Sequence, residues 1–199
     1  DRVVASGSAN VNLLEMLGIE SSNHKFEYNL NVSYSKTLAK DFTFVPAFIQ
    51  STTNYLSKKD EVLSEGYRNY STALIENFIT YDGRFGLNHV NVVVGQTFER
   101  ELFHNVAARG INLPEPYFLQ IGNAVETDAS SPENEHKLKS YIARFNYDFG
   151  EKYLLSLTAR RDGSSRLTPD IRWEWFPSLS AGWRIDQEEF FPVSKTTIN

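Results

Sequence analysis

Residues 140–191 alternate between apolar and polar side chains in three successive runs, and this alternation restricts the stretch to β-structure. The runs cover 140–149, 153–160 and 173–185. Successive side chains of a strand point to opposite faces, so each run predicts a strand with one apolar and one mostly polar face. A short turn at 149–152 and a polar loop at 163–172 join the three strands.

The two predicted faces differ in charge. The apolar face is represented by Tyr141, Phe145, Leu155, Trp173 and Trp183. The opposite face carries Arg144, Asp148, Arg160, Glu174 and Arg184. No Asp, Glu, Lys or Arg occupies the apolar face of these strands. Because a basic side chain facing lipid costs about 2–4 kcal/mol at the bilayer midplane, this face suits a membrane-facing surface. A soluble β-sandwich would turn the same face inward, so alternation alone leaves both architectures open.

The earlier part of the chain repeats this plan less clearly. Residues 1–22 read as a loop with a weak helical or strand segment. Strands are predicted at 24–37, 42–50, 73–81 and 85–98, with tight turns at 38–41 and 82–84. Pro46 lacks a backbone donor, which favours a bulge or an edge position.

The connections are expected to alternate in length. Polar connections are predicted at 51–72 and 99–137, the second opening with a short helix from residue 97 to near Gly110. Its acidic section, 128–135, is expected to be mobile. Tight turns at one end and long loops at the other are typical of an outer-membrane barrel.

The spacing of Trp173 and Trp183 fits a membrane. Ten residues of strand span about 33 Å, which a tilt near 40° reduces to about 25 Å along the membrane normal. This is close to the height of the apolar band between aromatic girdles. Two core tryptophans in a soluble sheet are the alternative.

Composition and motifs argue against several functions. The net charge of −5 gives no basic footprint for nucleic acid, and the absence of cysteine excludes thiolate metal sites. No run approaches the roughly 18 apolar residues of a membrane helix. No two of the four histidines have metal-ligand spacing, no phosphate-binding glycine loop occurs, and no activated serine accompanies His89. We therefore expect no enzymatic activity, no cofactor and no metal.

The loop after the second run holds the only candidate ligand contacts, Arg161, Asp162 and Arg166. They could bind a solute by hydrogen bonds or form an ion-paired turn, and both readings remain open at this point.

Four segments of residues 140–191 together resemble the barrel signature of SusC/RagA-type TonB-linked outer-membrane proteins of Bacteroidetes. They are the aromatic run 141–147, the Lys-Tyr-Leu-Leu at 152–155, the Arg-Arg-Asp-Gly-Ser-Ser-Arg at 160–166 and the Phe-Pro-Ser…Ser-Ala-Gly-Trp-Arg at 176–184. They cover about a quarter of the chain and are specific in combination. Residues 24–100 resemble the family only in having strand pairs of the same length that are rich in Asn and aromatic residues.

The resemblance implies a plugged transmembrane β-barrel that imports large nutrients, typically oligosaccharides or peptides. Its partners would be the TonB complex, a SusD-like surface lipoprotein and outer-membrane lipid. The expected fold is all-β, an antiparallel up-and-down meander of about eight strands forming one segment of the barrel. Within this partial barrel, 1–23 is loop or partial strand, 24–98 strand pairs, 99–137 a long extracellular loop and 138–199 the signature strands.

The sequence shows no signal peptide, plug or closing strand, so we expect a middle slice of a longer protein. Such a slice is predicted to associate or to need detergent, because it exposes two sheet edges and an apolar face. The alternatives are a soluble β-sandwich that binds carbohydrate and a passive porin-like barrel. The sandwich would bury the aromatic face, and the importer requires a plug.

Overall fold

The computed structural model describes residues 1–49, 57–58, 60–114 and 118–191, and almost all of its regular structure is strand. The strands are β1 (Arg2–Asn12), β2 (His24–Val45), β3 (Phe48–Ile49), β4 (Ser57–Lys58), β5 (Val62–Phe85), β6 (Asn88–Ile111), β7 (Glu126–Ser130), β8 (Glu133–Phe149), β9 (Tyr153–Ser164) and β10 (Trp173–Trp183). The helical elements are α1 (Leu13–Met16) and the 3-10 turns η1 (Ile121–Asn123), η2 (Pro169–Ile171) and η3 (Ile185–Gln187). Residues 50–56, 59, 115–117 and 192–199 of the predicted segments lie outside the described residues.

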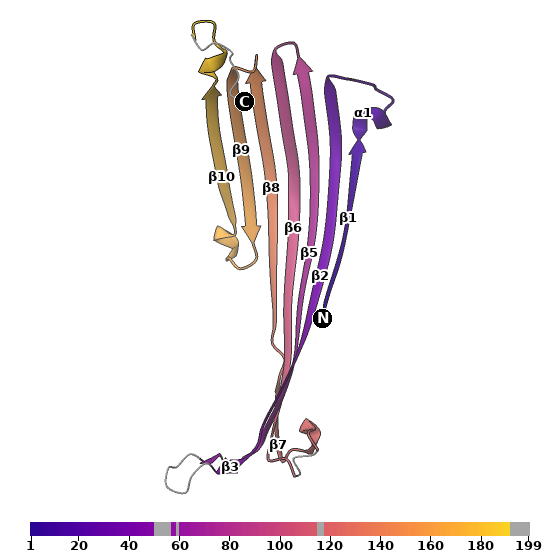
Figure 1. Ribbon diagram of the computed structural model, residues 1–199, viewed down its shortest axis with the longest axis vertical. Coiled ribbons are helices and arrows are strands. Elements are labelled where there is room, and N and C mark those ends of the chain that lie inside the picture. Colours follow the sequence, from indigo (N-terminus) through magenta and orange to yellow (C-terminus); the bar gives the residue numbers. More distant parts are fainter. Residues whose placement is uncertain (50–56, 59, 115–117, 192–199) are drawn as a thin grey trace, which may run out of the picture. The chain divides into compact units, whose positions relative to one another are not determined.

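Eight strands form one sheet in the order β1-β2-β5-β6-β8-β9-β10, with β7 paired to β6 (Figure 1). The strands β3 and β4 form a separate two-stranded ladder. Strands that follow one another along the sheet follow one another in the chain, apart from the short β3, β4 and β7. The predicted antiparallel meander of about eight strands is therefore confirmed.

Contacts divide the chain into two compact units. The first unit comprises Asp1–Ala5, Tyr34–Ala73 and Glu101–His136, and the second comprises Ser6–Ser33, Leu74–Arg100 and Lys137–Asn199. The long strands β2, β5 and β6 contribute to both.

Two reversals of the second unit depend on residues with positive φ. Gly86 (φ 61°) turns the chain between β5 and β6, and Gly150 and Glu151 (φ 62° and 57°) turn it between β8 and β9. The N–H of Gly150 donates to the carbonyl of Leu87 at 2.7 Å, so the two turns lie side by side. The predicted turn at 149–152 is confirmed. The turn predicted at 82–84 lies at 86–87 instead, and Gly83 stays in the strand, where a Cβ would meet Tyr81 and His24.

The turn predicted at 38–41 is wrong, because β2 runs through it without a break. Of its four residues only Asp41 tolerates positive φ, and the segment contains no Gly. Its polar side chains instead pair across the strands. Arg68 donates from Nε and Nη2 to the two carboxylate oxygens of Asp41 at 2.8 and 2.7 Å, and Lys40 lies 5.3 Å from the ring centre of Tyr67.

The single loop predicted at 99–137 is also wrong. Its first part continues β6 to Ile111, with no helix at 97–110, and its last part forms β7 and the start of β8. The section at 128–135, expected to be mobile, falls largely in these two strands. Backbone pairing of β7 with β6 satisfies the polar main chain there, so a charged sequence remains extended. The true connection is 112–125, and β5 likewise begins at Val62 inside the connection predicted at 51–72.

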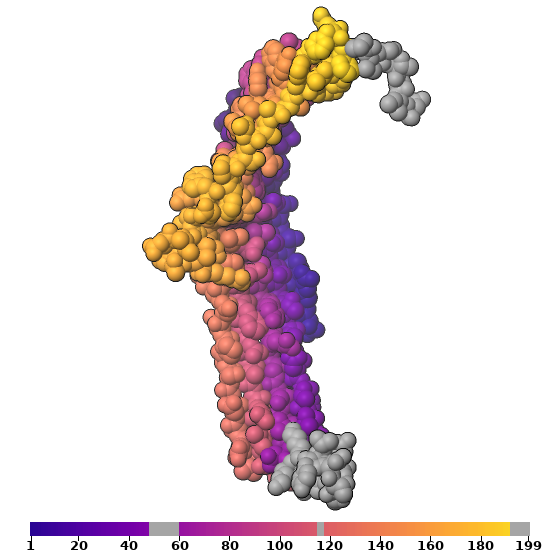
Figure 2. Space-filling view, turned by 90° about the vertical axis from the view of Figure 1, so that its left-hand side faces the viewer, coloured from indigo at the N-terminus to yellow at the C-terminus, as the bar shows by residue number. Residues whose placement is uncertain are grey.

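The described residues bury few hydrophobic side chains. The buried ones are Val62, Leu63 and Leu113, all in the first unit. In the second unit Leu179 is 69% exposed and Trp175 58% exposed. A sandwich would bury these side chains between two layers, so the structure contradicts the soluble alternative. Figure 2 looks at the edge of the sheet, where β10 (yellow) lies nearest the viewer.

Candidate functional site

The backbone register aligns the apolar faces of β8, β9 and β10. Phe145 lies opposite Leu157, which lies opposite Leu179. The same alignment holds along the three strands for Ala143, Ala159 and Pro177, for Tyr147, Leu155 and Ala181, and for Phe149, Tyr153 and Trp183. The five residues predicted for this face, Tyr141, Phe145, Leu155, Trp173 and Trp183, all occupy it.

One end of this face, next to the connection 165–172, carries an aromatic cluster with a cation in it. We call Tyr141, Arg161, Trp173 and Trp175 the loop-end cluster. The rings of Tyr141 and Trp173 stack with centroids 5.8 Å apart. Trp173 lies flat over Gly163, where a Cβ would approach its ring atoms to 2.8 Å. Gly163 therefore allows the indole of β10 to reach across β9 toward β8.

The other end, next to the turn at 150–152, carries a second aromatic cluster. We call Phe149, Tyr153, Trp183 and Phe190 the turn-end cluster. Its successive ring centroids lie 6.3, 6.4 and 6.3 Å apart.

Glu188 closes the turn-end cluster. Its carboxylate accepts from the Tyr153 hydroxyl at 2.8 Å, the Trp183 indole N–H at 3.1 Å and Lys152 Nζ at 3.1 Å. Hydrogen bonds from Tyr153, then Trp183 and Lys152, hold the pKa of Glu188 below its ordinary value. The polar atoms of this cluster are thus satisfied within the chain.

The opposite face of the same strands is polar. Arg144 lies opposite Thr158, which lies opposite Ser178, and Asn146 lies opposite Ser156. The predicted residues Arg144, Asp148, Arg160 and Glu174 all occupy this face, and Arg184 follows the end of β10. Phe176, Ile142 and Leu154 share it, so it is less uniformly polar than the alternation suggested.

A hydrogen-bond network crosses four strands on this polar face. His89 Nε2 lies 3.0 Å from an Asp82 carboxylate oxygen, and Asn91 donates to the same oxygen at 3.0 Å. Asn146 donates to Asn91 at 3.3 Å, and Ser156 donates to Asn146 at 2.7 Å. Its members come from β5, β6, β8 and β9, so no single stretch of the sequence signals it.

The three candidate ligand residues of the loop do not converge. Asp162 accepts from Arg160 Nε at 2.7 and 2.9 Å on the polar face, whereas Arg161 lies on the aromatic face. Arg166 lies in the connection after β9, where its N–H donates to Ser164 Oγ at 3.3 Å. A single solute site built from Arg161, Asp162 and Arg166 therefore has no geometric support.

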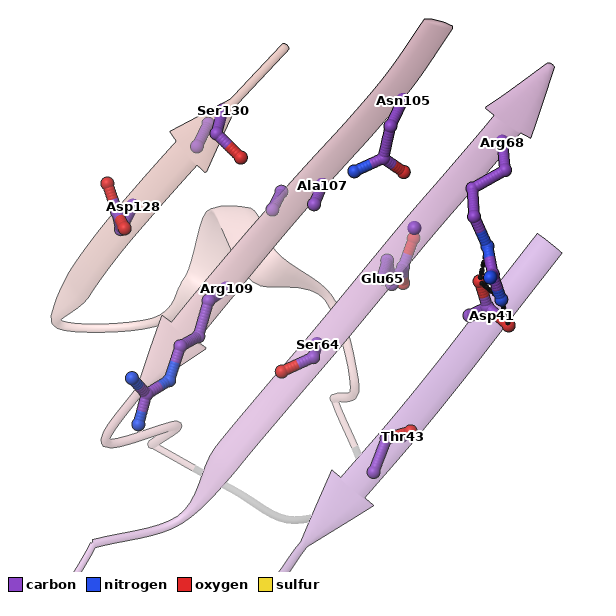
Figure 3. A pocket seen from close by; sticks show the side chains of 13 residues that line it. Asp41, Thr43, Ser64, Glu65, Arg68, Asn105, Ala107, Arg109, Asp128 and Ser130 are labelled. Atoms are coloured by element: carbon purple, nitrogen blue, oxygen red, sulfur yellow. Dashed lines mark hydrogen bonds and ion pairs between the residues drawn. The ribbon is translucent and has the colours of Figure 1, made fainter. Parts of the chain in front are cut away.

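The first unit contains a polar pocket of about 430 Å³ that sequence reasoning missed (Figure 3). Small residues, including Gly66, Ala107 and Ala129, form part of its lining. The bidentate Asp41–Arg68 pair lies on one side of it. On the other side of the pocket, Arg109 of β6 lies opposite Asp128 of β7. Among the described residues no ion pair joins these two side chains. Hydrogen-bonding and charged groups around a small-residue lining can bind a polar solute.

The histidines are dispersed and each has a local partner. His24 Nδ1 lies 3.0 Å from the Tyr81 hydroxyl, and His104 Nε2 lies 2.9 Å from Ser131 Oγ. His136 lies 3.3 Å from a Glu101 carboxylate oxygen. Within residues 1–49, 57–58, 60–114 and 118–191, no group of three or more His, Cys, Asp or Glu side chains is placed to hold a metal ion. In the same ranges no helix has the length and apolar character needed to cross a membrane.

Comparisons with known proteins agree with this two-faced sheet. The family model described as TonB dependent receptor-like, beta-barrel, matches residues 6–190. TonB-dependent receptor P3 of Formosa agariphila is 33% identical over 133 residues, which are 65% of this chain and 13% of that protein. TonB-dependent receptor SusC of Bacteroides thetaiotaomicron is 34% identical over 116 residues, 57% of this chain and 11% of the relative.

A solved structure titled "Structure of the RagAB peptide transporter" shares the fold, with a TM-score of 0.66 and 17% identity over 97% of this chain and 21% of that one. The chain thus spans only 11–21% of the length of these three proteins. Their architecture places the sheet in the outer membrane. The chain belongs to the TonB-dependent receptor-like β-barrel family and is of the SusC/RagA type.

Proposed function

We propose that this chain forms part of the barrel wall of a TonB-dependent importer, with its aromatic face toward lipid and its polar face toward the lumen. The observation that carries the proposal is the register of β8–β10, which gathers apolar side chains on one face and polar side chains on the other. A barrel that conducts polar solutes through lipid needs this division.

The two aromatic clusters support a membrane-spanning position. Trp173 and Trp183 are the first and last residues of β10, about 33 Å apart along the strand. With the strand tilt usual in such barrels, the clusters lie about 25 Å apart along the membrane normal. Between them the face carries Ala, Phe, Tyr, Leu and Pro only.

The strand lengths support a wall that continues beyond the bilayer. β5 and β6 have 24 residues each, about 80 Å of extended chain, whereas a membrane crossing needs about 9–11 residues. In this family type short turns face the periplasm and longer connections face outward. We therefore assign the turns at Gly86 and Gly150 to the periplasmic side and the connection 112–125 to the outside.

The proposed cargo is a large nutrient such as an oligosaccharide or a peptide. One structural relative is titled a peptide transporter, and SusC is one of the sequence relatives. The pocket of Figure 3 offers solute contacts in the first unit, with Arg109 exposed beside Asp128. Partners would be the TonB complex and a SusD-like surface lipoprotein. A passive porin-like barrel would instead keep taking up solute after energy coupling is removed.

Cysteine labelling tests the assignment of faces, because the chain has no cysteine of its own. Single cysteines at Ser156 and Ser178 would report the polar face, and cysteines at the neighbouring Leu157 and Leu179 the aromatic face. In the receptor that carries this chain, embedded in outer membrane, we expect a hydrophilic maleimide to label the first pair and spare the second. All four should react after denaturation in detergent. Equal labelling of both pairs in the membrane would contradict the proposed orientation.

A further inference from the structure

Arg161 is a charged residue inside the aromatic end of the lipid-facing surface, and its environment points to a ligand. Its guanidinium carbon lies 5.0 Å from the ring centre of Trp173 and 5.5 Å from that of Trp175. These two indoles hold the side chain along the sheet surface by cation–π contact. Arg161 therefore stays on the aromatic face instead of turning toward water.

In the part of the chain that the structure describes, no acidic residue neutralises this cation. The neighbouring Asp162 points to the other face and is occupied by Arg160. Among the described residues no carboxylate comes within ion-pair distance of Arg161, and its Nε is buried without a hydrogen-bond partner. A cation held against apolar rings without a carboxylate partner favours an anion from outside the chain.

A second cation lies beside it on the same face. Lys139 of β8 lies opposite Gly163 of β9, and Tyr141 lies opposite Arg161. Lys139 and Arg161 are therefore diagonal neighbours on the same face of the two strands. The Lys139 ammonium lies 5.2 Å from the ring centre of Tyr141. Both cations sit where the uncharged band ends, which is the depth at which lipid headgroups meet an aromatic girdle.

We infer that Arg161 and Lys139 bind the phosphate of an anionic lipid headgroup at the loop end of the membrane span. The guanidinium fork matches two phosphate oxygens, and the ammonium supplies a further point charge. The aromatic rings beside them accommodate the glycerol portion and the first acyl carbons. The inference rests on the proposed orientation, in which this face meets lipid.

The test uses the full receptor, purified in a neutral detergent and titrated with phosphatidylglycerol or with phosphatidylcholine of the same acyl chains. Native mass spectrometry counts the bound lipids. We expect the first phosphatidylglycerol to bind about tenfold more tightly than phosphatidylcholine, in line with the strength of charge-assisted hydrogen bonds. Arg161→Gln should remove this preference, and Arg161→Lys should restore part of it.

Two further variants keep the test decisive. Lys139→Gln leaves the tryptophan packing intact and should weaken the preference severalfold, even if Arg161→Gln proves hard to fold. Arg144→Gln removes a charge from the opposite face of β8 and should leave the preference unchanged.

If the preference for phosphatidylglycerol over phosphatidylcholine is unchanged in both Arg161→Gln and Lys139→Gln, the inference is overturned. It is also overturned if Arg144→Gln loses the preference to the same extent as Arg161→Gln. In those cases the cysteine pattern at 156–157 and 178–179 would still stand. If instead the orientation itself is wrong, that labelling pattern fails as well, so the two failures are distinguishable.

Discussion

The two aromatic clusters of β8–β10 are built alike but differ in how their polar atoms are satisfied. Each stacks a tyrosine ring with a tryptophan ring, Tyr141 of β8 with Trp173 of β10 at one end and Tyr153 of β9 with Trp183 of β10 at the other. At the turn end the chain supplies its own anion, Glu188, which binds three donors. At the loop end the chain supplies a cation, Arg161, and no anion. The first cluster is thus complete within the chain, and the second requires a partner from its surroundings.

The band between the clusters should be the most sensitive place for a charge. Leu179→Arg places a guanidinium at the middle of β10, and we expect it to destabilise the folded barrel by about 2–4 kcal/mol, since the charge would face hydrocarbon. Urea unfolding of the receptor refolded into lipid vesicles measures this loss. Ser178→Arg, one residue away on the polar face, is the matched control and should cost much less. Equal losses would mean that both faces meet the same medium.

Filling the gap under Trp173 should damage the loop-end cluster. Gly163→Ala brings a methyl group to 2.8 Å from the indole ring, so the ring must move away from Tyr141 and Arg161. We expect a loss of about 1–3 kcal/mol, as for overpacked sites. The melting temperature of the receptor in detergent reports it.

Gly182→Ala is the control for this substitution, because its Cβ would meet Leu154 at an ordinary 3.5 Å. A melting temperature that falls equally in both variants would point to strand backbone effects and not to the indole packing.

The turn-end cluster should depend on pH in a direction set by Glu188. The pKa of Glu188 is lowered in the folded state, so its contribution to stability is present above the pKa of an unfolded glutamate and is lost as pH falls through the lower, folded value. Hydrogen exchange of the backbone around 185–191 should therefore speed up at acidic pH. Glu188→Gln should show the faster exchange at neutral pH already, with little further pH dependence.

Glu189→Gln, at the exposed neighbouring position, is the control and should behave like the unmodified chain. Faster exchange in this variant would show that any charge in the turn has the same effect.

The sequence predicts the faces of β8–β10 correctly at 141–149, 153–159 and 173–183, because apolar and polar side chains alternate clearly in these ranges. Tyr141, Phe145 and Leu155 fall where alternation places them, and the Gly150 turn is marked by a residue that tolerates positive φ. The hydrophobic pattern and the turn chemistry agree there, so either one identifies the strands.

The same reasoning fails in β2, β5 and β6, where the strands are too long for a membrane crossing. Around Lys40 and Asp41, and again from Glu99 to Glu101, both faces are polar and the alternation loses its contrast. Pairing with neighbouring strands keeps the backbone extended there, and no local signal encodes that pairing. The pocket around Arg109 and the Asp82–His89 network were missed for this reason, since their members meet only through the sheet.

The alternation that places aromatic side chains on one face also separates them with polar residues in the sequence. Mean hydropathy is −0.40, and polar residues interrupt every apolar run. A secretion channel that recognises membrane helices by about 19 consecutive apolar residues therefore meets no stop signal in this stretch. The polypeptide can cross the inner membrane as an ordinary exported chain. Its continuous apolar surface forms only when the strands pair into a sheet, which happens at the outer membrane.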